Sequence, residues 1–282
     1  EICEDAWVVN RPGGEMAAEG VDVILNPSAS HFAFGKFEIR KRLVIEGSRA
    51  FSVSYVSTNL LGNEAGRIVY DGGALIASAG KLLALGPRLS FGPTALTTAV
   101  IDVEATRMNR VRTGSFQPDL SGKDQNTVSC DFTFEDVEPQ SPSPRSADWE
   151  SSSYLKEEEF TRAVALGLFD YLRKSRAHGF VVSLSGGADS SAVACLVALM
   201  TELGVDELGA DGFDAALGHI PALEKARSLK DRVGCLLHCV YQASRNSSQS
   251  TRDAATGLAG ALGAEISCLQ IDALVEGYVS NI

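Results

Sequence analysis

Two short segments carry residue types that could do chemistry. The first is Ser185-Gly186-Gly187-Ala188-Asp189-Ser190-Ser191, which directly follows an apolar run at 181–184. Glycines permit a tight turn and let backbone N–H groups approach an anion, and the start of a helix favours negative charge. The serine hydroxyls add hydrogen-bond donors, and Asp189 could hold the Mg²⁺ that accompanies a nucleotide. The segment therefore predicts a phosphate-binding loop between a strand and a helix.

The second segment is Glu1-Ile2-Cys3-Glu4-Asp5, which places a cysteine between acidic residues at the end of an expected strand. A cysteine attacks carbonyl carbon as the thiolate, so a nucleophilic Cys3 needs a base or a cation beside it. The alternative is a structural cysteine, because free cysteines are most often small buried apolar residues.

The phosphate loop does not have the Gly-x-x-x-x-Gly-Lys-Ser/Thr spacing of the common P-loop, and no lysine follows Gly187. Ser-Gly-Gly-x-Asp-Ser-Ser after a strand resembles the pyrophosphate loop of the N-type ATP pyrophosphatase family. That resemblance implies adenylation of a carbonyl or carboxyl oxygen by ATP, release of pyrophosphate, and displacement of AMP by ammonia or another nucleophile. The alternative is an ordinary Gly/Ser turn between strand and helix.

The first half of the chain predicts an ordered series of elements around a turn at 26–30. Strands are expected at 21–25, 52–57 and 99–103, with a helix at 36–49, a helix after the third strand, and a hairpin of 70–76 with 79–84 that turns at Ala79-Gly80. With Glu-Ile-Cys-Glu-Asp, this series resembles the second half of the nitrilase-type glutaminase domain of glutamine-dependent NAD synthetases. The resemblance makes Cys3 the nucleophile of a Glu-Lys-Cys triad and places Glu4 and Ser30 at the glutamine site. The triad's base and lysine precede the cysteine in that family and are not in this sequence, so these 282 residues alone are expected to be inactive as a glutaminase.

The second half predicts a different kind of domain after a connector. Periodicity fades over 115–153, where proline and serine are frequent, so we expect domains at 1–114 and 154–282 joined by this linker. Helices are expected at 154–177 and 192–203 and before Gly263, and strands at 179–184, 236–241 and 265–271, with 204–232 as a surface excursion. The expected fold class is therefore α/β: a partial nitrilase-type sandwich followed by a doubly wound parallel sheet with helices on both faces.

A second loop follows the expected strand at 236–241. Ligands of parallel sheets gather at the carboxyl ends of strands, so Arg245-Asn246-Ser247-Ser248 and the phosphate loop are expected to face one nucleotide. The segment resembles a second motif of NAD synthetases, and Arg245 or Arg252 could contact phosphate or ribose. An alternative, compatible with the first, is that the polar residues cap the next helix. Cys235, His238 and Cys239 supply too few ligands for a metal and are expected to pack.

Composition limits the classes of partner. A net charge of −11 argues against general binding of nucleic acid or anionic membranes, and six cysteines are too few for a disulfide scaffold, which favours the cytoplasm. No apolar run reaches the roughly eighteen residues that span a bilayer. The chain begins without methionine and ends within a helical pattern at 278–282, so we expect a piece of a longer protein.

The two resemblances together predict a glutamine-hydrolysing NAD synthetase. It would use ATP, Mg²⁺ and glutamine to amidate deamido-NAD, releasing AMP and pyrophosphate, with a protected route for ammonia, and is expected to form a homo-oligomer. One alternative is another ATP-pyrophosphatase amidotransferase, such as GMP or asparagine synthetase, which carries a different glutaminase domain. Another is a non-catalytic nucleotide-binding module.

Overall fold

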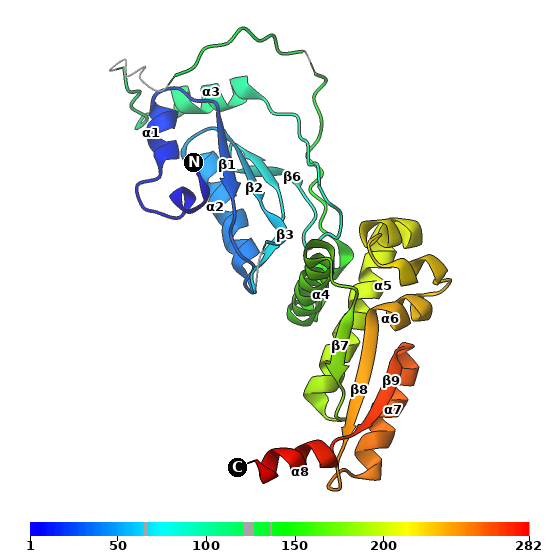
Figure 1. Cartoon of the computed structure of the whole chain (residues 1–282). Helices are drawn as coiled ribbons and strands as arrows, with labels where there is room; N and C mark the ends of the chain where they lie inside the picture. The colour runs from blue at the N-terminus through cyan, green and yellow to red at the C-terminus, as the bar shows by residue number, and fades with distance from the viewer. Residues whose placement is uncertain (65–66, 121–126, 136, 282) are drawn as a thin grey trace. The chain divides into compact units, whose positions relative to one another are not determined.

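A computed structural model describes residues 1–64, 67–120, 127–135 and 137–281 (Figure 1). The chain divides into two compact units, Glu1–Gly62 with Ile68–Lys156 and Asn63–Arg67 with Glu157–Ile282. Parts of the expected linker, 121–126 and 136, and the end of the expected terminal helix, Ile282, lie outside the described residues.

The first unit contains a four-stranded sheet in the order β1-β2-β5-β6. Strands β1 (Val23–Ser28) and β2 (Ser54–Asn59) are parallel, joined through helix α2 (Lys36–Ala50). Strands β5 (Leu75–Ser78) and β6 (Lys81–Leu85) are antiparallel and form a hairpin at the expected turn, although its first strand begins at Leu75 and not at 70. Its turn residues Ala79 and Gly80 both have positive φ, 49° and 83°, which such a tight turn requires.

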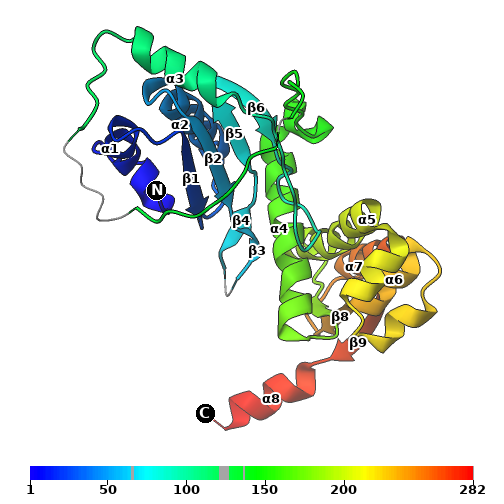
Figure 2. The ribbon, with the colours of Figure 1, turned by 90° about the horizontal axis from the view of Figure 1, so that it is seen from above.

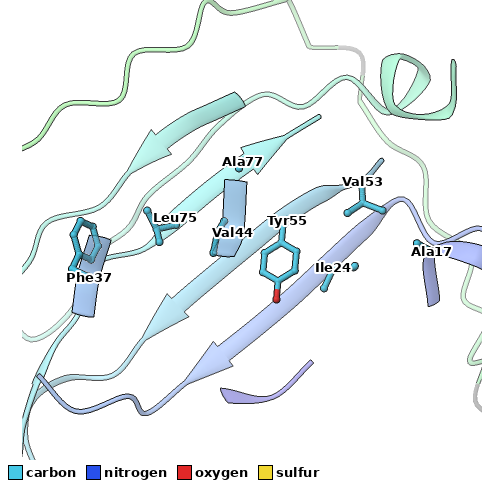
Figure 3. Close-up of a cluster of buried hydrophobic side chains, with 8 residues drawn as sticks. All are labelled: Ala17, Ile24, Phe37, Val44, Val53, Tyr55, Leu75 and Ala77. Carbon is cyan, nitrogen blue, oxygen red and sulfur yellow. The ribbon is translucent and has the colours of Figure 1, made fainter. Parts of the chain in front are cut away.

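One face of this sheet is packed against α2. The buried positions of α2 recur three to four residues apart, the period of one helix face: Phe37, Arg40, Val44, Gly47 and Ser48. Their apolar members meet side chains from the strands in a single cluster of Ala17, Ile24, Phe37, Val44, Val53, Tyr55, Leu75 and Ala77 (Figure 3). This core fixes β1 and β2, whose carboxyl ends carry the residues of interest.

Shorter elements surround the sheet: η1 (Cys3–Ala6), α1 (Pro12–Ala18), β3 (Leu61–Asn63), β4 (Val69–Asp71), α3 (Val103–Arg112) and η3 (Asp148–Ser151). The prediction of a strand at 99–103 is wrong, because residues 99–102 form no strand and Val103 already begins α3. Asp102 instead caps α3, with its carboxylate accepting a hydrogen bond from the backbone N–H of Ala105 at 2.9 Å.

The second unit is a parallel α/β domain. Strands β7 (Phe180–Ser183), β8 (Leu237–Ala243) and β9 (Glu265–Gln270) pair in that order, all parallel. Helix α4 (Leu155–Ser175) precedes β7, α5 (Ala188–Ala216), η4 (Pro221–Lys225) and α6 (Leu229–Leu236) connect β7 to β8, and α7 (Gln249–Leu262) connects β8 to β9. The α/β class is confirmed. Helices α5 and α7 contact each other, as expected when successive parallel strands lie in sequence order and crossovers of one hand place their helices on the same face.

The segment 204–232 is not the surface excursion expected from the sequence. Helix α5 continues to Ala216 through a break at Gly209, where φ is 72° and ψ is 163°. Four side chains of this segment are almost completely buried: Phe213, Leu217, Ile220 and Leu223. The segment therefore belongs to the core of the second unit.

Helix α5 is also long and apolar enough to cross a membrane by length and composition alone, contrary to the expectation from the sequence. Its contacts with α6, α7, β7 and β8 are those of a helix that covers a sheet, and Gly209 interrupts it. By contrast, α8 (Asp272–Ser280) has no buried residue and leads away from the end of β9 in both views (Figures 1 and 2).

Candidate active sites

Cys3 stands at the start of η1 with a left-handed backbone, φ 44°, and a half-buried side chain. A residue other than glycine in this region is strained, and such residues gather at functional sites. Two hydrogen bonds hold Glu1, two residues before Cys3, against β1. The backbone N of Glu1 donates to the Leu25 carbonyl at 3.1 Å, and the Asn26 amide donates to the Glu1 carbonyl at 3.3 Å. These bonds place Cys3 beside β1.

The carboxylate of Glu1 anchors this turn from inside the first unit. It is completely buried and accepts hydrogen bonds from the backbone N–H of Gly13 at 2.8 Å, from Arg11 at 3.2 Å and from the Tyr55 hydroxyl. Burial, followed by the hydrogen bond to Glu1, raises the pKa of Tyr55 well above its usual value. The Arg11 guanidinium lies 5.0 Å from the centre of the Phe51 ring, so the cation is itself packed.

Replacing Arg11 by methionine is expected to destabilise the protein by about 3–5 kcal/mol, because it leaves the buried Glu1 carboxylate without its counter-charge. The free energy of unfolding in urea measures this loss. Arg49→Met is the matched control, since Arg49 pairs with Glu46 on the surface, where both side chains are more than 60% exposed. This exposed pair is expected to contribute little to stability, and equal effects of the two substitutions would contradict the anchoring role of Arg11.

A lysine that the sequence reasoning missed lies within electrostatic range of Cys3. Burial and the neighbouring Arg40 lower the pKa of Lys36, while the charges of Asp71 and Cys3 act in the opposite direction. The Lys36 Nζ donates to the His31 carbonyl at 3.1 Å and lies 6.0 Å from the centre of the Trp7 ring. A cation here favours a thiolate at Cys3. The sequence signal that could have identified Lys36 is its position at the start of the helix that follows the turn at 26–30.

Of the two residues expected at the glutamine site, Ser30 is buried just beyond β1, and Glu4 is exposed. The main chain of Ser30 is held by the Asn59 side chain, which accepts from its N–H at 2.8 Å and donates to its carbonyl at 2.9 Å. The Glu4 carboxylate makes no hydrogen bond to the part of the chain that the structure describes, so it is free to meet a ligand.

The phosphate loop lies where the sequence places it, between the end of β7 and the start of α5. Leu184 still pairs with β8, its N–H bonding the Val240 carbonyl at 2.9 Å, and the chain then turns at Gly186 with φ 80°. Inside the loop the hydroxyls of Ser185 and Ser190 lie 3.0 Å apart. Helix α5 begins at Ala188, four residues earlier than expected, so Asp189 lies in its first turn, near the positive end of the helix.

The second loop lies beside the first. A Cβ on Gly186 would be 2.4 Å from the carbonyl oxygen of Thr251, so the phosphate loop touches the first turn of α7. Ser248 caps that helix by accepting from the Thr251 N–H at 3.2 Å, which confirms the capping alternative. Arg245 is paired with Asp272 at 3.4 Å and with Glu276, whereas the Arg252 side chain is exposed and makes no hydrogen bond to the described residues.

Gly186→Ala is expected to weaken binding of Mg²⁺-ATP at least about tenfold, because the new Cβ would collide with Thr251 and the residue would keep a positive φ. Gly187→Ala is the matched control. Gly187 has no positive φ, and a Cβ there would meet only the Ser185 Oγ, at 3.3 Å. Nucleotide titration by calorimetry measures both. Equal affinities would contradict the close packing of the two loops.

The residues around the phosphate loop fit Mg²⁺ bound together with a nucleotide. No group of three His, Cys, Asp or Glu side chains within the described ranges could hold a metal by itself. Mg²⁺ commonly takes one or two carboxylates plus substrate phosphates, and exposed Asp189 offers one carboxylate.

On strand β8, Cys239 is buried, which raises the pKa of its thiol, while His238 on the opposite face bonds the Ser267 hydroxyl at 2.9 Å. The expectation of a packing role holds for Cys239.

The second unit is a parallel α/β domain with a glycine-containing loop between the end of β7 and the start of α5, and residues 160–282 match the family model described as NAD synthase. The chain is 33% identical over 286 residues to the glutamine-dependent NAD(+) synthetase of Homo sapiens, covering 99% of this chain and 40% of that protein. For the enzyme of Mus musculus the identity is 32%, with 99% and 39% covered. Over nearly its whole length the chain is therefore similar to glutamine-dependent NAD(+) synthetases.

Solved structures of glutamine-dependent NAD(+) synthetases are similar to this chain as well. The crystal structure of a glutamine-dependent NAD(+) synthetase from Cytophaga hutchinsonii superposes with a TM-score of 0.71 at 37% identity, covering 100% of this chain and 40% of that chain. The Acinetobacter baumannii enzyme, at 17% identity and a TM-score of 0.61, shares the fold. This chain spans about 40% of the length of the relatives that it matches.

Proposed function

We propose that this chain forms part of an enzyme that amidates deamido-NAD to NAD, with ATP as energy source and glutamine as nitrogen donor. The observation that carries the proposal is the presence, in one chain similar to these enzymes, of a strained cysteine turn, of a buried serine just beyond β1, and of a phosphate loop at a strand end. The first site suits amide hydrolysis, and the second suits ATP. The cytoplasm is the proposed location and a homo-oligomer the proposed assembly, with no affinity for nucleic acid at a net charge of −11.

At the first site the Cys3 thiolate attacks the side-chain carbonyl carbon of glutamine. The carbon–nitrogen bond breaks, and the amide nitrogen takes up a proton and leaves as ammonia. Water then hydrolyses the thioester, which releases glutamate and the Cys3 sulfur. Ser30 and Glu4 hold the substrate, and a cation at Lys36 would favour the Cys3 thiolate. Because the chain spans about 40% of the length of its relatives, this proposal concerns the full-length protein.

At the second site the backbone N–H groups at Gly186 and Gly187 and the serine hydroxyls bind the β- and γ-phosphates of ATP. The nicotinate carboxylate of deamido-NAD attacks the α-phosphorus, and pyrophosphate leaves. Mg²⁺ beside Asp189 would offset the charge of the departing pyrophosphate. Ammonia then attacks the acyl carbon, AMP leaves, and the amide forms with release of one proton.

The full-length protein supplied with deamido-NAD, ATP, Mg²⁺ and glutamine tests this function. We expect NAD, AMP, pyrophosphate and glutamate in equal amounts, and the same NAD and AMP when ammonia replaces glutamine. AMP formation that does not require deamido-NAD would overturn the assigned substrate, and NAD formation with ammonia but not with glutamine would overturn the role of glutamine.

A further inference from the structure

The side chain of Asn59 acts as a strand partner for Ser30 beyond the end of the sheet. Strand pairing of β1 with β2 ends at Ser28 opposite Asn59, and the Leu60 N–H still bonds the Ser28 carbonyl at 2.8 Å. Two residues further along the chain, the Asn59 side-chain amide replaces a strand partner. It accepts a hydrogen bond from the N–H of Ser30 and donates one to the Ser30 carbonyl. One side chain therefore fixes both polar groups of the Ser30 main chain.

A buried charge cluster fixes which way this amide points. The Asn59 Nδ2 also donates to an Asp71 carboxylate oxygen at 2.8 Å. A carboxylate only accepts hydrogen bonds, so it requires the nitrogen on its side and leaves the Asn59 oxygen for the Ser30 N–H. Asp71 is in turn compensated by Arg40 at 2.6 Å and Arg88 at 3.5 Å, with all three side chains at most 7% exposed.

The cluster reaches beyond the sheet through Arg88, which pairs with buried Glu150 of η3 at 3.1 Å. The Arg88 guanidinium carbon lies 4.3 Å from the centre of the Phe37 ring and 5.4 Å from that of Trp149, so the cation is held on aromatic faces. Packing of this kind restrains the cluster, and the hydrogen bonds of Asn59 to Asp71 and to Ser30 restrain the Ser30 main chain in turn.

We propose that Asn59 is a positioning residue for glutamine recognition. It does not touch the substrate; it holds Ser30, while the Lys36 bond to the carbonyl of the next residue, His31, holds the same turn from the other side. The inference rests on the proposed function, in which Ser30 contacts glutamine. Loss of the amide lets this turn move and weakens glutamine binding without affecting ATP chemistry.

Asn59→Ala in the full-length protein tests the proposal. We expect the KM for glutamine to rise about tenfold, because two hydrogen bonds to the turn are lost, while kcat with glutamine changes less. The ammonia-driven rate should stay within about twofold. Asn59→Asp should be impaired at least as much, because it keeps only the acceptor and adds a negative charge beside Asp71. Asn109→Ala, an asparagine of α3 whose side chain makes no hydrogen bond to the described residues, should match the wild type.

An unchanged KM for glutamine in folded Asn59→Ala protein would overturn the positioning role. An equal fall of the glutamine- and ammonia-driven rates would show a merely structural role and would also overturn it. If Asn59→Ala does not fold, Asn59→Ser, which keeps one hydrogen-bonding group, gives the same readout, and a normal KM there contradicts the proposal. Failure of the proposed function is separate, since it would appear in the wild-type protein as no glutamine-driven synthesis of NAD.

Discussion

Cys3→Ala is expected to abolish NAD formation from glutamine in the full-length protein while leaving ammonia-driven formation within about twofold of the wild-type rate. Removing the sulfur removes the only atom that forms the thioester, so the glutamine-driven rate should fall by at least about a thousandfold. The side chain is half-buried, and alanine fits the space that the thiol leaves. Both rates are measured by following NAD at saturating deamido-NAD and ATP.

Cys130→Ala is the matched control, because Cys130 is an exposed free cysteine of the same chain. It should leave both rates unchanged. If folded Cys3→Ala protein loses the ammonia-driven reaction as well, the two activities are not separable as proposed, and the role of Cys3 as nucleophile for glutamine alone is wrong.

Asp189→Ala is expected to abolish both the glutamine- and the ammonia-driven reactions, each by at least about a hundredfold. The carboxylate in the first turn of α5 is the residue that would keep Mg²⁺ beside the pyrophosphate, and both reactions require its departure. The readout is pyrophosphate release in the presence of deamido-NAD. Asp206→Ala, an exposed aspartate further along the same helix, is the control and should have the wild-type rate.

Hydrolysis of glutamine to glutamate should survive in the Asp189→Ala protein, because Cys3 belongs to the other site. A variant that still releases pyrophosphate at the wild-type rate would remove Asp189 from the ATP site. A variant that also loses glutamine hydrolysis would point to a fault in the whole protein, which circular dichroism and thermal unfolding would reveal.

The sequence predicts best the features that local chemistry determines. The strand, glycine turn and helix at 181–191 follow from apolar residues, positive φ and a helix start within eleven neighbouring residues. The hairpin at Ala79-Gly80 and the cap at Ser248 are equally local. For the same reason the α/β class could be predicted from the alternation of short apolar runs with helical segments.

Features that depend on partners distant in the sequence could not be predicted. Val100 and Ile101 are apolar and β-branched, but a strand needs a neighbour and this run has none among the described residues, while Val103 begins α3. The segment 204–232 looked exposed because its apolar side chains are spread over several turns, and the fold gathers Phe213 and Leu223 into the core.

The same limit applies to the candidate sites. Asn59 is an ordinary polar residue in the sequence, and only the pairing of β1 with β2 brings it to the turn that holds Ser30. Lys36 is close to this turn in sequence, but its residue type alone does not mark it as part of the site. The buried ion pairs of Asp71 with Arg40 and Arg88 join residues between 17 and 31 positions apart in sequence, a separation that no local pattern reports.

The most direct test of the central claim is isotopic transfer in the full-length protein. Glutamine labelled with ¹⁵N in its side-chain amide is supplied with deamido-NAD, ATP and Mg²⁺ in a pool of unlabelled ammonia, and the carboxamide of the product NAD is analysed by mass spectrometry. We predict ¹⁵N in the carboxamide of wild-type product and only unlabelled nitrogen in that of Cys3→Ala. Unlabelled NAD from the wild-type protein would contradict the claim that the Cys3 site feeds the phosphate-loop site.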